Sequence, residues 1–253
     1  MSANHAAFNL IFRFVENYIS PVAGRISSQR HVMAIRDGFI SAMPFMIVGS
    51  FLLVFAYPPF SPDTTWGFAR AWLDLAKEFE GRILTPFDMT MGIMSIYICA
   101  AIAYNLGKHY EKTNQLDPFM CAMLSIMAFL LVAAPKTNGN LPVDSLGGTG
   151  IFTAILVAVY CVEMMRFLKA HNIGIRLPDQ VPPMIKNSFD LLIPVLVVVL
   201  TLYPLSLLIQ HHFDMLIPQA IMAIFKPLVS AADSLPAILL AVLVGHLLWF
   251  ARS

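Results

Sequence analysis

The chain has 253 residues, of which 58% are hydrophobic and only 12% are charged, whereas soluble domains carry roughly 25% charged residues. The 16 Lys and Arg residues nearly balance the 15 Asp and Glu residues, so the net charge is +1 and no basic stripe is present. This composition excludes a disordered chain and a nucleic-acid-binding protein, and it argues against a soluble enzyme. The mean hydropathy of +0.73 indicates a polytopic membrane protein instead.

Residues 1–37 are predicted to form a cytoplasmic amphipathic segment. A helix ended by Pro21 would carry apolar side chains on one face and polar ones on the other. The stretch 68–80 repeats this pattern and is also predicted to lie at the membrane interface. The apolar stretch 215–225 is too short to span the membrane and is predicted to be interfacial or re-entrant. A surface for a partner helix is the alternative for each stretch. In the predicted helix before Pro21, the apolar face consists of Phe8, Ile11, Phe12, Val15 and Ile19.

Six runs of the sequence contain no charged residue and are each long enough to span a membrane. A spanning helix needs roughly 20 mostly apolar residues, with a minimum near 17. The sequence therefore predicts an all-α membrane protein with about six transmembrane helices. The runs are residues 38–62, 89–107, 118–135, 145–162, 191–213 and 234–251.

The alternative is a soluble protein with six buried helices, which would normally show a polar face on each helix. Residues 191–200 (LLIPVLVVVL) and 237–244 (AILLAVLV) show none. A membrane β-barrel is excluded because its strands alternate polar and apolar residues.

The orientation follows from the distribution of Lys and Arg. Eleven of the 16 basic residues lie in the N-terminal segment, in the second and fourth connections and after the last run. Because cytoplasmic loops carry an excess of Lys and Arg, both termini are predicted to be cytoplasmic.

Candidate chemistry is sparse, and no residue is assigned a catalytic, cofactor-binding or metal-binding role. Cys99, Cys121 and Cys161 all fall inside predicted spans and form no CxxC pair, so small apolar packing is the favoured interpretation. His246 lies inside the last span, where an ionisable residue is either a functional group or a hydrogen-bonded packing residue. Asp88 is expected to cap the second span, with a cavity-facing position as the alternative.

Four prolines fall inside predicted spans, and each removes a backbone donor. Transporters use such broken helices where backbone must line a cavity, although simple kinks explain the prolines equally well. They are Pro44, Pro194, Pro204 and Pro236.

Three blocks of sequence carry a family resemblance. Residues 31–50 read HVMAIRDGFISAMPFMIVGS, residues 92–95 read GIMS and are followed by an apolar hairpin ending LSIMAFLLVAAP, and residues 177–194 read LPDQVPPMIKNSFDLLIP. In this order they resemble the lactose/cellobiose/diacetylchitobiose class of enzyme IIC, the membrane permease subunit of the phosphoenolpyruvate-dependent sugar phosphotransferase system.

The resemblance implies disaccharide uptake coupled to phosphorylation. It also implies IIB and IIA subunits as partners, with the phosphoryl group carried by IIB rather than by this chain, and a homodimer whose contacts lie mostly in the N-terminal half. The sugar would bind mostly in the C-terminal half. His246 and Trp249 are the candidate substrate-binding residues here, with an interfacial-belt role as the alternative for Trp249.

The resemblance stops at residues 247–250 (LLWF), after which the chain reads Ala251, Arg252 and Ser253. The family's GIHG block does not follow. We therefore expect residues 38–253 to be the N-terminal transmembrane part of a permease that lacks its C-terminal substrate half, and not to transport alone. The alternative function is a membrane dimerisation module that pairs with a full-length permease. A channel or ion-coupled carrier ranks last because the span centres lack ionisable pairs apart from His246.

Overall fold

The computed structural model describes residues 20–135, 139, 141–175, 182, 185, 189–232, 234, 237–239, 242–243 and 245–246. Within these residues the regular structure is entirely helical and contains no strand, which confirms the predicted all-α class. The chain divides into two compact units. One comprises residues 34–222, and the other comprises residues 1–33 together with 223–253.

The smaller unit is described only in part. It contains α2 (Ser20–Ser27), the start of α3, and the later part of α10 (Ile217–Ala232), which begins in the larger unit. The predicted amphipathic helix before Pro21 lies almost wholly outside the described residues, as does most of the sixth predicted span.

Three helices of the described part are long and apolar enough to cross a membrane. They are α3 (Arg30–Ala56), α7 (Ile151–Ala170) together with the short 3₁₀ turn η2 (Gly148–Gly150) before it, and α9 (Leu192–Phe213). A fourth, α6 (Pro118–Ala133), is apolar but has only 16 residues. The total of six spans stays a prediction.

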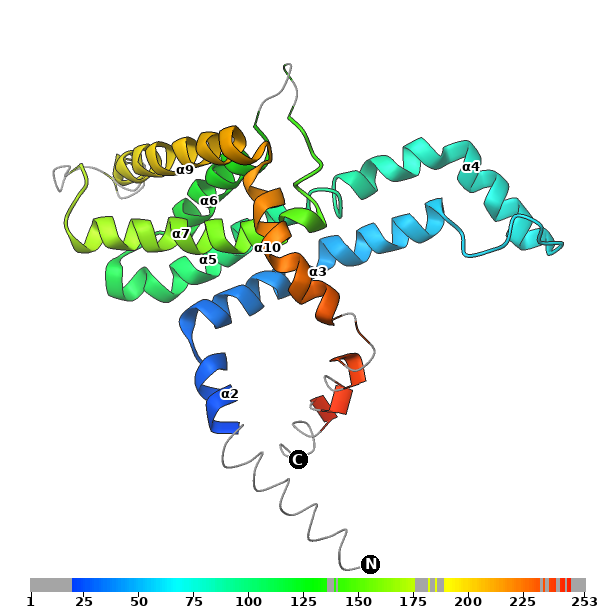
Figure 1. Ribbon diagram of the computed structural model, residues 1–253, viewed down its shortest axis with the longest axis horizontal. Coiled ribbons are helices and arrows are strands. Elements are labelled where there is room, and N and C mark those ends of the chain that lie inside the picture. Colours follow the sequence, from blue (N-terminus) through cyan, green and yellow to red (C-terminus); the bar gives the residue numbers. More distant parts are fainter. Residues whose placement is uncertain are drawn as a thin grey trace, which may run out of the picture. The chain divides into compact units, whose positions relative to one another are not determined.

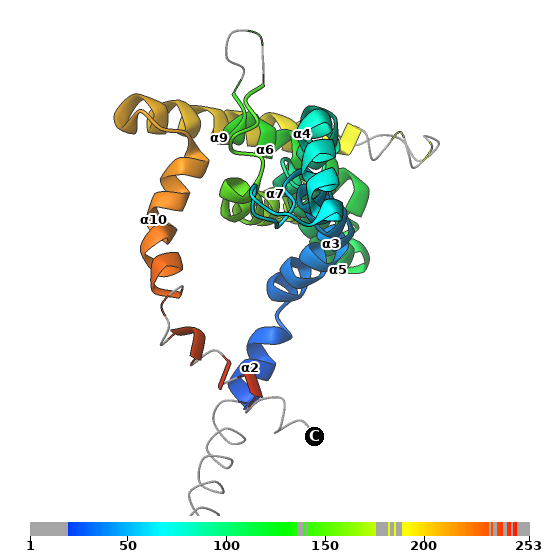
Figure 2. The ribbon, with the colours of Figure 1, turned by 90° about the vertical axis from the view of Figure 1, so that its right-hand side faces the viewer.

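The core of the larger unit is a cluster of four helices, α5 (Met94–Asn114), α6, α7 and α9 (Figures 1 and 2). Ile98 of α5, Phe129 of α6, Val162 of α7 and Val198 of α9 are fully buried within it. Small side chains let the helices approach closely, as expected for helices packed in a membrane.

Cysteine and glycine contribute to this close packing. A Cβ placed on Gly107 of α5 would lie 2.9 Å from Sγ of Cys121 on α6. Cys99, Cys121 and Cys161 are all buried and carry free thiols, which confirms that they pack inside the helix cluster.

Helix α3 packs against α5 through a glycine and an aromatic pair. A Cβ on Gly38 would lie 2.8 Å from the backbone nitrogen of Ile102, so only glycine permits this approach. Further along α3, the ring of Phe45 stacks on Tyr97 with centroids 4.4 Å apart.

The predicted amphipathic stretch 68–80 forms the first part of α4 (Gly67–Asp88), which runs back alongside the end of α3 (Figure 1). Nε1 of Trp72 donates to the carbonyl oxygen of Phe55 at 3.2 Å, and the Tyr57 hydroxyl donates to Glu80 at 2.8 Å. The helical prediction is therefore confirmed, while placement at the membrane interface stays a prediction.

The expected helix-capping role of Asp88 is wrong. Asp88 is the last residue of α4 and is exposed, and α5 begins only at Met94. The backbone amide of Ser95 instead donates to the carbonyl oxygen of Leu146 at 2.9 Å. The Ser95 hydroxyl donates to the carbonyl oxygen of Gly147 at 2.6 Å. A loop that is distant in sequence thus supplies the hydrogen-bond acceptors for the first turn of α5. No local sequence pattern could reveal these acceptors.

The prolines do not interrupt the described spans. Helix α3 continues through Pro44 and α9 through Pro204, which favours the kink interpretation over broken helices. Pro194 is the third residue of α9, where its missing amide hydrogen costs no intrahelical bond. Pro236 lies outside the described residues.

Candidate functional site

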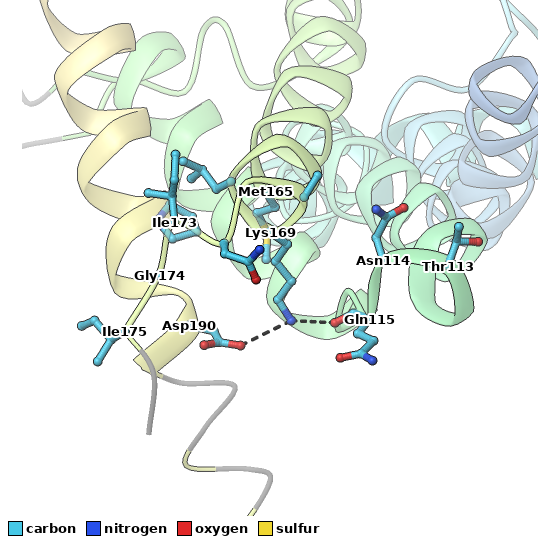
Figure 3. A pocket seen from close by; sticks show the side chains of 13 residues that line it. Thr113, Asn114, Gln115, Met165, Lys169, Ile173, Gly174, Ile175 and Asp190 are labelled. Carbon is cyan, nitrogen blue, oxygen red and sulfur yellow. Dashed lines mark hydrogen bonds and ion pairs between the residues drawn. The ribbon is translucent and has the colours of Figure 1, made fainter. Parts of the chain in front are cut away.

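A pocket of about 550 Å³ lies where α5 and α7 end and α9 begins. Its wall combines polar side chains with apolar ones, and Figure 3 shows most of them around the end of α7. The polar members are Thr113, Asn114, Gln115, Lys169, Asn172 and Asp190.

The chain reverses sharply at this end of the helix cluster for local reasons. Gln115 adopts a left-handed conformation, φ 53°, and ends α5. Asp117 then caps α6, because its Oδ1 accepts from the amides of Phe119 at 2.9 Å and Met120 at 3.2 Å. Asn172 adopts φ 55° just after α7. Both left-handed turns present backbone and side-chain polar groups to the pocket.

Lys169 joins three parts of the site. Its Nζ donates to the carbonyl oxygen of Gln115 at 2.6 Å and lies 3.3 Å from Oδ2 of Asp190 (Figure 3). The first contact places a cation on a carbonyl oxygen that has no partner within α5, at the end of the helix where the helix dipole favours positive charge. Lys169 therefore holds the ends of α5 and α7 and the start of α9 together around the pocket.

A second polar cluster lies one turn further into α7. The Tyr110 hydroxyl donates to Oε1 of Glu163 at 2.8 Å and accepts from Nη1 of Arg166 at 2.9 Å. Arg166 also pairs with Glu163 at 3.2 Å and lies over the Tyr110 ring, 4.8 Å from its centroid. These contacts let two opposite charges remain within a mostly apolar helix.

This cluster explains why the fourth predicted span ended too early. The prediction stopped at residue 162 because Glu163 is charged, whereas α7 continues to Ala170. Because Tyr110 lies 53 residues before Glu163, no local pattern indicated that its hydroxyl would bind this carboxylate. The spacing of Glu163, Arg166 and Lys169 along one helical face was the available signal.

We expect Arg166→Met to destabilise the protein because it removes the cation that pairs with Glu163. The pair is partly exposed, with side-chain exposures of 40% and 29%, so the loss should be about 1 kcal/mol, or about 2 to 4 °C in thermal midpoint. A thiol-reactive dye that reports exposure of the buried cysteines would measure it. The double variant Glu163→Gln/Arg166→Met should regain part of the loss. Strictly additive losses would contradict a coupled cluster.

Of the two residues proposed from the sequence as sugar ligands, His246 is not among the described residues that line this pocket. His246 is exposed, and its Nδ1 donates to the carbonyl oxygen of Val242 at 2.8 Å. Trp249 lies outside the described residues. The pocket around Lys169 was not predicted, because its members come from three separate segments of the chain.

The lining of the pocket suits recognition rather than covalent chemistry. Amide and hydroxyl groups can donate and accept hydrogen bonds, and Lys169 and Asp190 supply one charge of each sign. None of the described residues that line it is a cysteine or histidine, the side chains that most readily carry a phosphoryl group or a metal. The site can bind a polar group at one end of the helix cluster.

The sequence of the chain is similar to those of known proteins. The chain is 32% identical to the PTS system cellobiose-specific EIIC component of Geobacillus stearothermophilus, over 94% of this chain and 54% of that protein. It is 34% identical to the PTS system lactose-specific EIICB component of Streptococcus mutans, over 91% of this chain and 40% of that protein.

The fold is also similar to a solved structure. The crystal structure of the transporter ChbC, the IIC component from the N,N'-diacetylchitobiose-specific phosphotransferase system, matches with a TM-score of 0.79 and 32% identity. The match covers 94% of this chain and 56% of ChbC. The chain thus spans about half the length of the relatives that it matches. Residues 36–251 match the family described as "Phosphotransferase system, EIIC", and the chain belongs to this family of membrane transport proteins.

Proposed function

We propose that this chain forms the N-terminal membrane part of a sugar-specific IIC permease that takes up a disaccharide of the cellobiose, lactose or chitobiose type. The observation that carries the proposal is the match to ChbC over 94% of the chain with a TM-score of 0.79. The names of the relatives specify cellobiose, lactose and N,N'-diacetylchitobiose, which are all disaccharides.

The partners of this permease would be the IIB and IIA subunits of the phosphotransferase system. Relatives named EIICB support a functional link between the C and B components. The sugar would be phosphorylated as it enters, with the phosphoryl group carried by the IIB subunit and not by this chain. Residues 1–253 expressed alone would not accumulate sugar phosphate, because they correspond to only 54% of the cellobiose-specific relative.

The proposed location is the bacterial inner membrane, with both termini cytoplasmic and the pocket around Lys169 on the cytoplasmic side. The basic residues near this pocket support the orientation. Lys108 and Lys112 lie toward the end of α5, and Arg166 and Lys169 lie toward the end of α7, so four cations gather at one end of the helix cluster.

A chimera tests the transport function. Residues 1–253 would replace the matching part of the Geobacillus cellobiose EIIC component, in cells that supply the soluble phosphotransfer proteins. Accumulation of labelled cellobiose phosphate above that of the relative's C-terminal part alone would support the proposal. A chimera that inserts into the membrane and binds the IIB subunit, yet accumulates no sugar phosphate, would contradict it.

His246 and Trp249 remain the proposed sugar ligands of this chain. Because Nδ1 of His246 donates to Val242, its Nε2 is the acceptor available to a sugar hydroxyl. In the chimera, His246→Ala should raise the KM for sugar. His212→Ala is a matched control, since its Nδ1 makes the same local contact with the carbonyl oxygen of Leu208. Equal KM changes for both variants would contradict the assignment.

The second candidate function is a membrane dimerisation module, and the surface of α3 favours it. Only 17% of the apolar stretch of α3 is buried, against 44% for α7. Its exposed side carries a hollow of about 390 Å³ lined almost wholly by apolar groups, namely Met43, Met46, Ile47, Ser50, Phe51 and Val54. We propose a second copy of this chain as the occupant, in line with the homodimer that the family resemblance implies.

Cysteine cross-linking tests this surface, because the native thiols are buried and should not react. Ile47→Cys should form a disulfide-linked dimer in oxidised membranes. Phe119→Cys is the control, since Phe119 is 60% exposed on α6 but lies outside the hollow. No cross-link at residue 47, or equal cross-linking at both positions, would contradict dimerisation through α3.

A further inference from the structure

A second polar cavity, of about 470 Å³, lies between the end of α3, the loop that follows and α4. Arg70, Asp74 and Lys77 line it from one face of α4, at the spacing that aligns side chains along a helix. Glu80 continues this face, and Tyr57 faces it from the end of α3. The cavity is separate from the pocket around Lys169 and has no role in the transport proposal.

The charges of this cavity balance. Two cations and two carboxylates line it, so the net charge of its side chains is zero. Glu80 is held in place by the Tyr57 hydroxyl at 2.8 Å, and this contact raises the pKa of Tyr57. Within the part of the chain that the structure describes, the side chains of Arg70, Asp74 and Lys77 make no hydrogen bond or ion pair with the protein. These three groups are therefore available to a ligand that carries charges of both signs.

An aromatic cluster beside the cavity indicates its depth in the membrane. Trp72 lies 5.6 to 5.9 Å from the rings of Phe55, Phe60 and Phe68, and Trp66 lies 6.0 Å from Phe60 and Phe68. Tryptophan and neighbouring aromatic rings concentrate at the level of the lipid headgroups. The apolar helix α3 ends at Ala56, which also lines the cavity, so we expect the hydrocarbon to end at this level.

We propose that this cavity binds the headgroup of a zwitterionic aminophospholipid. Arg70 and Lys77 would bind the phosphate, and Asp74 and Glu80 would bind the primary ammonium. An anionic lipid has no cationic group that could pair with the two carboxylates of the cavity. A choline headgroup has no N–H to donate to those carboxylates. The aromatic cluster would pack against the first segment of the acyl chains.

Native mass spectrometry of the 253-residue chain in detergent tests the proposal. The probes are phosphatidylethanolamine, phosphatidylglycerol and phosphatidylcholine with identical acyl chains at equal concentration. The ethanolamine lipid should give the most abundant adduct. Arg70→Gln and Lys77→Gln should each weaken its binding by about two- to fivefold, the range expected for a contact with an exposed charge. Glu80→Gln should lower the preference for phosphatidylethanolamine over phosphatidylglycerol, a ratio that does not depend on the folded fraction.

Two controls lie on the same helix. Glu78→Gln and Arg82→Gln remove charges that do not line the cavity, and Arg82 lies instead over the Phe79 ring at 5.5 Å. Both variants should bind as the parent does. O-Phosphoethanolamine, which has no acyl chains, should not compete at the same concentration. Equal adducts for the three lipids, losses in the control variants equal to those at Arg70, or full competition by O-phosphoethanolamine would each overturn the lipid site.

Discussion

Phe129→Ala should lower the thermal midpoint of this protein by about 6 to 12 °C, the shift that corresponds to about 3 kcal/mol in a chain of this size. Phe129 is completely buried between the helices of the α5, α6, α7 and α9 cluster. Its ring also approaches Gly150 at the start of α7, where an added Cβ would lie 3.1 Å from Cζ. Truncation leaves a cavity that these close-packed helices cannot refill, so dispersion contacts are lost outright.

The matched control is Phe119→Ala on the same helix. Phe119 is 60% exposed, so its removal opens no internal cavity and should change the midpoint by less than about 2 °C. The midpoint can be followed with a thiol-reactive dye in detergent, because Cys99, Cys121 and Cys161 become reactive only when the helix cluster opens. Similar shifts for the two variants would show that Phe129 is not in the core.

Gly38→Ala should destabilise the protein, whereas Gly81→Ala should stabilise it. The added methyl at residue 38 would press on the backbone of Ile102 at 2.8 Å, and backbone cannot move aside without displacing α5. Overpacking of this kind costs about 1–3 kcal/mol. Gly81 has nothing within 4 Å of an added Cβ, so alanine gains helix propensity there, up to about 1 kcal/mol.

The opposite signs make this pair informative, since both substitutions are identical and both sites lie within helices. The same dye assay would resolve them as a midpoint lowered by about 2 to 12 °C at residue 38 and raised by up to about 4 °C at residue 81. Two shifts of the same sign would mean that α3 does not pack on α5 through Gly38.

The helices whose ends coincide with charged or capping residues were predicted well from the sequence. The run 118–135 begins where α6 begins, because Asp117 is both the charge that bounds the run and the residue that caps the helix. The run 191–213 matches α9 to within one residue at its start. In both cases a charged residue just before the apolar run also marks the start of the helix to within one residue.

The prediction failed where a charged residue is satisfied inside a helix. Helix α3 begins at Arg30 rather than at residue 38, and Nε of Arg36 donates to Oδ1 of Asp37 at 2.8 Å within it. Helix α7 continues past Glu163 because Tyr110 and Arg166 satisfy that carboxylate. Asp37 is the residue next to Arg36, whereas Tyr110 comes from another helix. In both cases the charge lies within the helix, so a run of uncharged residues underestimates the length of the helix.

The pocket around Lys169 could not be predicted for a related reason. Its wall comes from the ends of α5 and α7 and the start of α9, and each segment alone reads as an ordinary helix terminus. Only the packing of the helix cluster brings Gln115 and Asp190 to the same ammonium group. The family resemblance pointed to the last span instead, and His246 and Trp249 rest on that resemblance and on their position.

Labelling of single cysteines from each side of the membrane tests the central claim, a chain that crosses the bilayer with the Lys169 pocket on the cytoplasmic side. The native thiols are buried and give a low background. The variants are Asp63→Cys and Asn172→Cys. Residue 63 lies in the exposed connection before α4, and residue 172 lies in the exposed connection after α7. With a membrane-impermeant maleimide, residue 172 should react only in inverted vesicles and residue 63 only in right-side-out vesicles. Reaction of both residues from the same side would contradict this account.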